Sequence, residues 1–260
     1  MCIRDSPISI RLANDQWINA ALDDNRLSLV PLLYGETAPM GPLLLSPENA
    51  LKLSSAALQN EDIQLAAMAN SNVSGPPPGM SYGEWLLYTG RIAIIAGRYA
   101  NGGMQLRRWI ESHETLTPEE TDSVLQPVFE LQTVDQHDLA LELLALIEDR
   151  SPGGKYVREI AFWMAESYEA TGRHMKAADY FLFSALQKDN GFDQWGESAR
   201  YRAADALLAG NFFGDARTLL EDLLARANEE KRVQALRDKL QQLWLRESKL
   251  AGSDNRNRGS

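Results

Sequence analysis

Histidines are the first residues to consider, because imidazole binds metals and transfers protons near neutral pH. The sequence has three, at His113, His137 and His174. None belongs to a His-Glu-x-x-His pair, and each is expected near a helix end or turn, where imidazole caps a helix or faces solvent. We therefore predict no metal site and no bound cofactor.

Paired carboxylates are the other candidates, since two acids can serve as general acid and base. Glu119-Glu120 and Glu229-Glu230 each stand where a helix is expected to begin, and acids are favourable in a first turn. Glu166 neighbours aromatic residues, but no catalytic signature accompanies it. The chain also has no phosphate-binding glycine loop and no Gly-x-Ser-x-Gly elbow. These patterns predict that this chain is not an enzyme.

Composition narrows the class of protein. The 260 residues are 44% hydrophobic and 24% charged, which is ordinary for a soluble globular protein. The net charge of -10 disfavours nucleic acid, whose phosphates require a basic surface. No apolar run approaches the roughly 18 residues that indicate a membrane span.

The first six residues, Met-Cys-Ile-Arg-Asp-Ser, resemble translated sequencing-adapter sequence. We expect residues 1–10 to be a non-native or disordered start, with the native beginning of the protein upstream. Cys2 is the only cysteine, so the remainder offers no disulfide and no thiolate ligand. Cysteine depletion favours the periplasm or cell envelope over the cytoplasm.

Helix start signals recur, and sustained strand patterns do not. Residues 11–70 are expected to form an N-terminal helical segment. Residues 71–80, which include three consecutive prolines, predict a surface loop and the main internal boundary, with a proline-rich docking motif as the alternative.

Two further helices are expected after this loop. Ser81 is expected to cap one that runs to about Tyr99 and ends at Asn101-Gly102-Gly103, and a partner follows from Met104 to about His113. Gly90 and Gly97 would then share a face and allow close packing. Thr117-Pro118-Glu119-Glu120 predicts the start of the next helix.

A repeat emerges from residue 117 onward. Each second helix of a pair opens with a small residue and has a bulky one four positions later, and a turn-forming residue precedes it. The small residues are Ala140, Ala177 and Ala216; the bulky ones are Leu144, Phe181 and Leu220; the turns fall at Asp135, Gly172 and Gly210. The small residue lets two antiparallel helices approach, and the bulky one fills the space between them.

This pattern resembles the tetratricopeptide repeat (TPR) family. The matching positions are Tyr168, Gly172, Ala177, Phe181 and Ser184 in one unit, and Ala140, Leu144, Ile147 and Pro152 in the preceding one. The third unit carries one extra residue in 211–215, and the period exceeds the usual 34 residues of the family. The resemblance implies an all-α, right-handed superhelical solenoid of antiparallel helix pairs over residues 81–250.

In this family the first helix of each pair lines a binding groove. Carrying those positions across gives a candidate groove formed by Asp122, Leu125, Phe129, Glu159, Phe162, Glu166, Glu169, Glu197 and Arg200. Acids among phenylalanines would suit an extended segment with basic and apolar side chains. The alternative is that Phe129 and Phe162 pack between helices while the acids are solvated.

The C-terminal region predicts one amphipathic helix over residues 229–248. Val233, Leu236, Leu240, Leu243 and Trp244 form its apolar stripe, which would cover the last open surface of a solenoid. Coiled-coil pairing with a second chain is the rival interpretation. Residues 251–260 are polar and are expected to form a disordered tail.

The resemblance implies a non-catalytic scaffold that binds a protein or peptide and supports assembly of a bacterial envelope complex. An alternative is an accessory superhelical domain of a cell-wall enzyme whose catalytic domain lies outside this chain. A third possibility is an oligomerisation module that uses the C-terminal helix. The sequence does not identify the partner or the oligomeric state.

Overall fold

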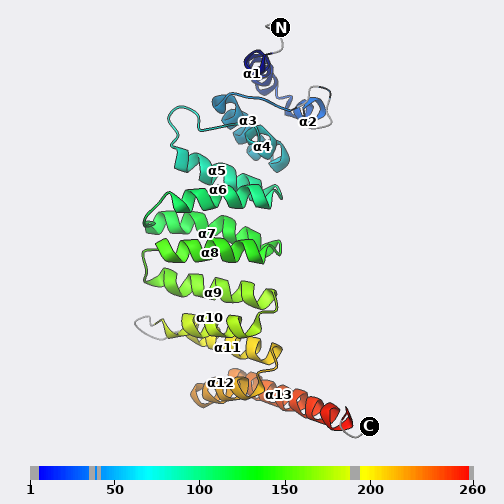
Figure 1. Ribbon diagram of the computed structural model, residues 1–260, viewed down its shortest axis with the longest axis vertical. Helices are drawn as coiled ribbons and strands as arrows, with labels where there is room; N and C mark the ends of the chain where they lie inside the picture. The colour runs from blue at the N-terminus through cyan, green and yellow to red at the C-terminus, as the bar shows by residue number, and fades with distance from the viewer. Residues whose placement is uncertain (1–5, 35–38, 40–41, 188–193, 258–260) are drawn as a thin grey trace. The chain divides into compact units, whose positions relative to one another are not determined.

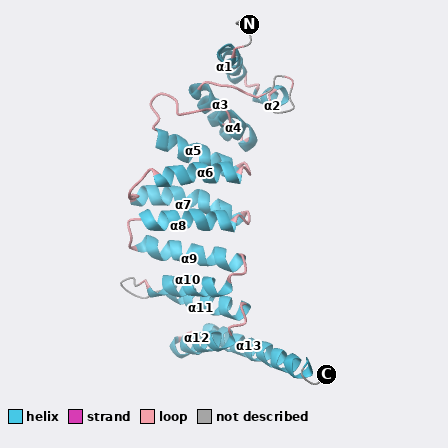
Figure 2. Ribbon diagram, viewed as in Figure 1, coloured by secondary structure: helices cyan, strands magenta, loops and turns pink. Residues whose placement is uncertain are grey.

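The computed structural model describes residues 6–34, 39, 42–187 and 194–257, with side chains described up to Lys249 except that of Gln194. Over these residues the chain forms thirteen α-helices and one short 3₁₀ helix, and it contains no strand (Figures 1 and 2). The expected all-α class is confirmed. Within the same residues, no helix is long and apolar enough to cross a membrane.

The chain divides into two compact units, Met1–Glu114 with Asp122–Leu131, and Thr115–Thr121 with Gln132–Ser260. The first unit holds α1 (Pro7–Asp23), η2 (Leu27–Leu29), α2 (Val30–Leu33), α3 (Pro47–Gln59), α4 (Ile63–Asn70), α5 (Tyr82–Ile95) and α6 (Tyr99–Glu111). The second holds α8 (His137–Arg150), α9 (Lys155–Ala170), α10 (His174–Leu186), α11 (Gln194–Ala209), α12 (Phe213–Arg226) and α13 (Glu230–Asn257). Helix α7 (Pro118–Thr133) contributes its middle to the first unit and its ends to the second.

Helix starts follow the sequence closely because they are chemically encoded. Ser46 caps α3 by accepting from the Asn49 amide, with Pro47 at the first helical position. Ser81 with Glu84, and Thr117 with Glu120, form complete capping boxes for α5 and α7. Residues 71–80 lie between α4 and α5 and contain no helix, but they fall inside the first compact unit.

The expected boundary between the two helices after Ser81 is wrong. Helix α5 ends at Ile95 and α6 already begins at Tyr99, so Gly102 and Gly103 lie inside α6 and do not end α5. Gly97 stands in the turn with φ of 80° and shares no helix face with Gly90. The glycine that meets Gly90 is Gly102, where an added Cβ would lie 2.8 Å from the Gly90 carbonyl oxygen.

One turn geometry recurs through both units. A residue with positive φ closes the first helix of each pair, at intervals of 36 to 39 residues: Asn25, Glu61, Gly97, Asp135, Gly172 and Asn211. At five of these turns the next amide donates to the carbonyl five residues earlier, as from Arg173 to Tyr168 at 2.8 Å and from Phe212 to Leu207 at 2.8 Å. This is the Schellman helix ending. The described residues therefore contain six helical hairpins with one type of connection.

This register corrects the third sequence repeat. The left-handed residue there is Asn211, five positions before Ala216, as Gly172 is five before Ala177. No extra residue is present. Gly210 has a separate role, because an added Cβ would lie 2.6 Å from the Phe212 ring and 2.9 Å from the His174 Cβ.

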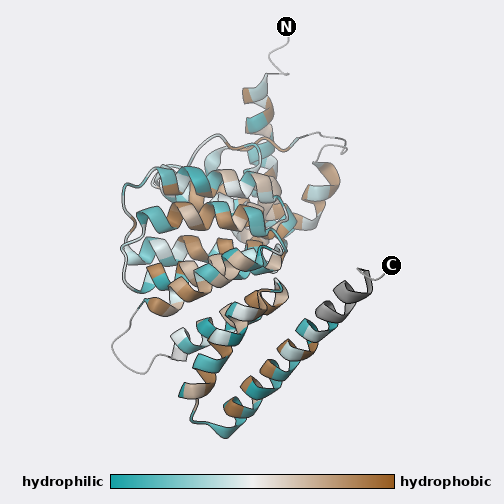
Figure 3. Cartoon of the chain, turned by 60° about the horizontal axis from the view of Figure 1, so that its bottom comes forward, coloured by the Kyte–Doolittle hydropathy of each residue, from teal (hydrophilic) through white to brown (hydrophobic). Residues whose placement is uncertain are grey.

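The core of the second unit contains the small and bulky positions of the repeat, with Ala177, Phe181, Ala216 and Leu220 fully buried. It ends on α13, where Leu236 and Leu243 are also fully buried, whereas Trp244 is 61% exposed. Hydrophobic residues recur along α13 among hydrophilic ones (Figure 3). Helix α13 continues to Asn257, past residue 251, where the tail was expected to begin.

Candidate functional site

Helices α9, α11 and α13 of the second unit share a face that is joined by ion pairs. We call it the ion-paired face and define it by Glu166, Glu169, Glu197, Arg202, Asp205, Arg232 and Lys239. The members on each helix are separated by roughly one or two turns, which places them on one side of that helix. Three of its four acids, Glu166, Glu169 and Glu197, are predicted groove residues.

Arg202 of α11 is the centre of this network. Its guanidinium lies 2.6 Å from the Glu166 carboxylate and 3.0 Å from that of Glu169, both on α9. The same guanidinium lies over the Phe181 ring at 5.5 Å. All three charged side chains are partly buried, so the network links two helices and leaves little of either acid free for a ligand.

The next link joins α11 to α13. Glu197 pairs with Arg232, and Asp205 pairs with Lys239. The Lys239 ammonium also lies 4.1 Å from the centre of the Tyr201 ring. Each acid of this face is therefore neutralised by a base from the following helix of the same unit.

Burial shapes the electrostatics of this face. It raises the pKa of Glu166, and the nearby Arg202 only partly offsets that effect. Burial likewise lowers the pKa of Lys239. Half-buried ion pairs of this kind recover by attraction roughly what they lose in hydration. We interpret the network as one that fixes how α9, α11 and α13 align.

The remaining predicted residues of the second unit have different surroundings. Phe162 packs in the core, with its ring 5.2 Å from that of Phe181 and 5.0 Å from that of Trp195. Arg200 donates to the Ala185 carbonyl at 3.5 Å. Glu159 is half-buried on α9, one helical face away from no other predicted acid but Glu166, seven residues later.

An open groove lies in the first unit, between α5 and the middle of α7. Its volume is about 520 Å³. It is lined by Glu84, Leu87, Tyr88, Arg91, Asp122, Ser123 and Gln126. Asp122 is the only predicted site residue among them; Leu125 is buried and Phe129 is half-buried on the same helix.

Charges in the α5/α7 groove are arranged differently from those of the ion-paired face. Within the described part of the chain, neither Arg91 nor Asp122 has a hydrogen-bond or ion-pair partner. Glu84 accepts from the Ser81 amide at 2.7 Å, and this bond, followed by that from the Ser81 hydroxyl, lowers the pKa of Glu84. The Tyr88 hydroxyl shares a hydrogen bond of 2.9 Å with Ser54 of α3, which orients the ring. The groove thus presents exposed charges beside a fixed aromatic ring.

Sequence reasoning missed the α5 side of this groove, although a signal was present. Gly97 and Asp135 occupy the same turn position and lie 38 residues apart, as do Glu84 and Asp122. Aligning the two turns would have paired Tyr88 with Gln126 in the same way. The misplaced end of α5 concealed that register.

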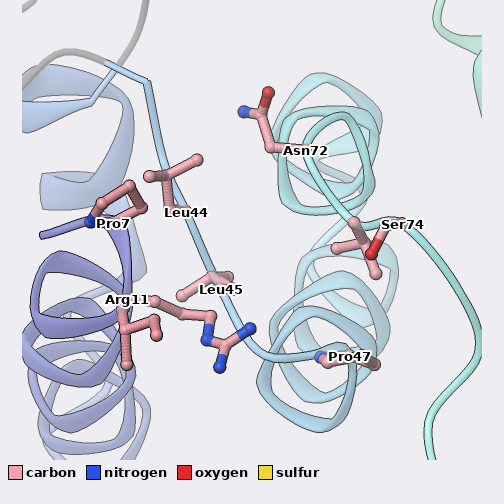
Figure 4. Close-up of a pocket in the computed structure, with 9 residues that line it drawn as sticks. Pro7, Arg11, Leu44, Leu45, Pro47, Asn72 and Ser74 are labelled. Atoms are coloured by element: carbon pink, nitrogen blue, oxygen red, sulfur yellow. The ribbon is translucent and has the colours of Figure 1, made fainter.

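A smaller pocket of about 230 Å³ lies near the start of α1, and Figure 4 shows its lining. Pro7, Leu44 and Leu45 supply apolar walls, and Arg11 extends toward Pro47. Asn72 on its other side donates to the Leu43 carbonyl at 3.1 Å. That amide therefore holds the 43–45 segment in place.

The histidines also occupy structural positions. His137 and His174 begin α8 and α10, and the His113 ring lies 4.5 Å from that of Trp109. Among the residues that the structure describes, no three His, Cys, Asp or Glu side chains are grouped closely enough to hold a metal ion.

Together these features define an all-α protein of helical hairpins with one internally paired face and one open groove. No protein-family model, no curated protein and no solved structure matches the chain.

Proposed function

We propose that this chain is a non-catalytic scaffold of TPR-like repeats that binds a protein or peptide partner, and that it supports assembly of a complex in the bacterial envelope. Right-handed superhelical stacking of the hairpins belongs to this proposal. Repeated helical hairpins commonly serve as binding surfaces, because each added pair extends a continuous face. The six equivalent turns support such an architecture.

The observation that carries the proposal is the α5/α7 groove. Its volume of about 520 Å³ falls in the range of ligand sites, and its lining combines apolar, aromatic and charged groups. A peptide can bury its apolar side chains there while its polar groups meet Arg91, Asp122 and Gln126.

Comparison of the two faces favours this groove as the binding surface. A ligand at the ion-paired face must compete with Arg202, Arg232 and Lys239 for acids that they already hold. A ligand at the α5/α7 groove displaces only water from Arg91 and Asp122. Binding energy is therefore more readily gained in the first unit.

The proposal is tested by selecting ligands from a displayed library of random twelve-residue peptides with the purified chain. Selected peptides are then measured by fluorescence polarisation against the wild type and against a double variant, Tyr88→Ala with Arg91→Glu. We expect the double variant to weaken binding at least tenfold, since it removes the aromatic surface and reverses the exposed charge.

Arg108→Glu is the matched control, because Arg108 is an exposed arginine on α6, outside the groove lining. It should leave the affinity within about twofold. Circular dichroism must show the same helix content for all three proteins. If the selection yields no peptide, or only peptides that bind the double variant equally well, the proposed function is wrong.

A further inference from the structure

The charges of the α5/α7 groove lie in a definite order. Glu84 stands in the first turn of α5, and Arg91 lies seven residues later on the same side of the helix. Asp122 of α7 occupies the hairpin position equivalent to Glu84. One end of the groove therefore carries two acids and the other end one base.

The region between these ends is apolar and preorganised. Leu87 and Tyr88 lie midway between Glu84 and Arg91, and the hydrogen bond between Tyr88 and Ser54 restrains the ring. A restrained ring loses little conformational freedom when a ligand side chain packs on it. The middle of the groove thus suits one apolar side chain.

The spacing of the charges sets the spacing in the ligand. Seven helical residues rise about 10 Å along the axis. An extended chain advances about 3.3 Å per residue, so about three residues of a bound strand span the same distance. A ligand with a base at one position and an acid three positions away would meet both ends.

We propose that the α5/α7 groove recognises an extended peptide segment in which a basic and an acidic side chain stand three residues apart with an apolar side chain between them. This inference rests on the proposed function and specifies its ligand. Complementary charge selects the pattern: the base faces Glu84 and Asp122, the acid faces Arg91, and like charges at these positions are repelled.

The test uses a synthetic array of acetylated, amidated ten-residue peptides with Gly-Ser flanks. The central four residues are Lys-Leu-Ala-Asp, the reverse order Asp-Ala-Leu-Lys, Lys-Leu-Ala-Lys, Asp-Leu-Ala-Asp, and Lys-Ser-Ala-Asp without the apolar residue. We expect the wild type to bind one of the two opposite-charge leucine peptides about threefold to tenfold more tightly than the other three.

Charge reversal in the protein makes the test specific. Arg91→Glu should transfer the preference to Lys-Leu-Ala-Lys, and Asp122→Lys should weaken the preferred peptide. Asp122 is the acid to change because Glu84 also closes the capping box of α5. A transferred preference cannot come from loss of folding, and the Arg108→Glu control should retain the wild-type order.

The outcomes separate this inference from the proposed function. If library peptides require Tyr88 and Arg91 but the array shows no preference for opposite charges, the charge pattern is wrong and the binding function stands. If neither library nor array yields groove-dependent binding, both fail. An order that Arg91→Glu leaves unchanged also contradicts the charge pattern.

Discussion

Single residues in this protein show how closely packing and charge depend on their neighbours. Gly102 was expected to end a helix, yet it lies buried within α6 against Gly90 of α5. Glu166 was expected to be available to a ligand, yet it pairs with Arg202. In both cases the residue type was correctly noticed, and its partner in space determined its role.

Gly102→Ala should destabilise the protein by about 1–3 kcal/mol, because the new methyl group would overlap Ile94 and the Gly90 backbone. An ideal Cβ would lie 2.6 Å from the Ile94 Cγ1 and 2.8 Å from the Gly90 carbonyl oxygen. Urea unfolding measures the loss. Gly214→Ala is the control, since its Cβ meets nothing within 4 Å; that variant should be neutral or up to about 1 kcal/mol more stable.

Glu166→Gln should become more favourable, relative to wild type, as the pH rises. The folded-state pKa of Glu166 is raised by burial, so the folded protein holds this proton more tightly than the unfolded chain. Its contribution to stability is then fully present below the unfolded pKa and is lost as the pH rises through the folded value. Arg202 keeps Glu169 as its partner in the variant.

The measurement for Glu166 is the difference in unfolding free energy between variant and wild type, by urea titration from pH 4 to pH 7. Taking the difference cancels groups that titrate alike in both proteins. A difference that stays constant, or moves against the variant with rising pH, would contradict a raised pKa.

At the scale of elements, the inter-helix turns are the most regular feature. Six turns in the described residues place one residue at positive φ, but only Gly97 and Gly172 are glycines there. Asn25, Glu61, Asp135 and Asn211 adopt the same conformation with a side chain present. Glutamate is the least suited of these, because asparagine and aspartate tolerate the left-handed region better.

Glu61→Gly should therefore stabilise the first unit by about 0.5–1 kcal/mol, since relief of the backbone strain exceeds the entropy that glycine adds to the unfolded chain. Thermal unfolding followed by circular dichroism would report it. Gln59→Gly, two residues earlier and still helical, is the control and should be destabilising by about 0.5–1 kcal/mol. Equal effects of the two glycines would show that the turn imposes no strain.

At the scale of the whole chain, much of the architecture could be predicted from sequence. Caps at Ser46, Ser81 and Thr117 are local chemistry, and the small and bulky series of the second unit follows from helix packing. These signals need only neighbouring residues. The all-helical class follows from them directly.

The candidate site was less accessible to prediction, for two physical reasons. Ion pairs such as Arg202 with Glu166 join residues 36 positions apart, and charge alone does not reveal which base meets which acid. The groove depends on the register of α5, and Gly102-Gly103 has the composition of a helix end while serving as a packing surface. The compact units also divide near residues 114–132, away from the proline-rich loop.

The terminal helix provides a prediction at this scale. Leu236→Ala should destabilise the second unit by about 2–5 kcal/mol, because Leu236 is fully buried and its loss opens a cavity where the core ends. Trp244→Ala on the same helix should change stability by less than about 0.5 kcal/mol, as this ring is 61% exposed. Chemical denaturation of both variants decides whether α13 covers the core through its Leu236 side.

Light scattering on the same two proteins addresses the rival use of α13. A wild-type dimer that Trp244→Ala converts to a monomer would favour pairing of this helix with a second chain. An unchanged mass would leave the covering role as the one supported by the buried leucines.

The recurring turn has a consequence for how such a chain diverges over time. Natural selection acts on the torsion angle, and several amino acids can supply it, so the letters at Asn25, Glu61, Asp135 and Asn211 are free to drift while the hairpins persist. Kinship between chains of this type is then retained in dihedral angles long after it has faded from the alphabet. A search by backbone angle would find six members where a search for glycine finds two.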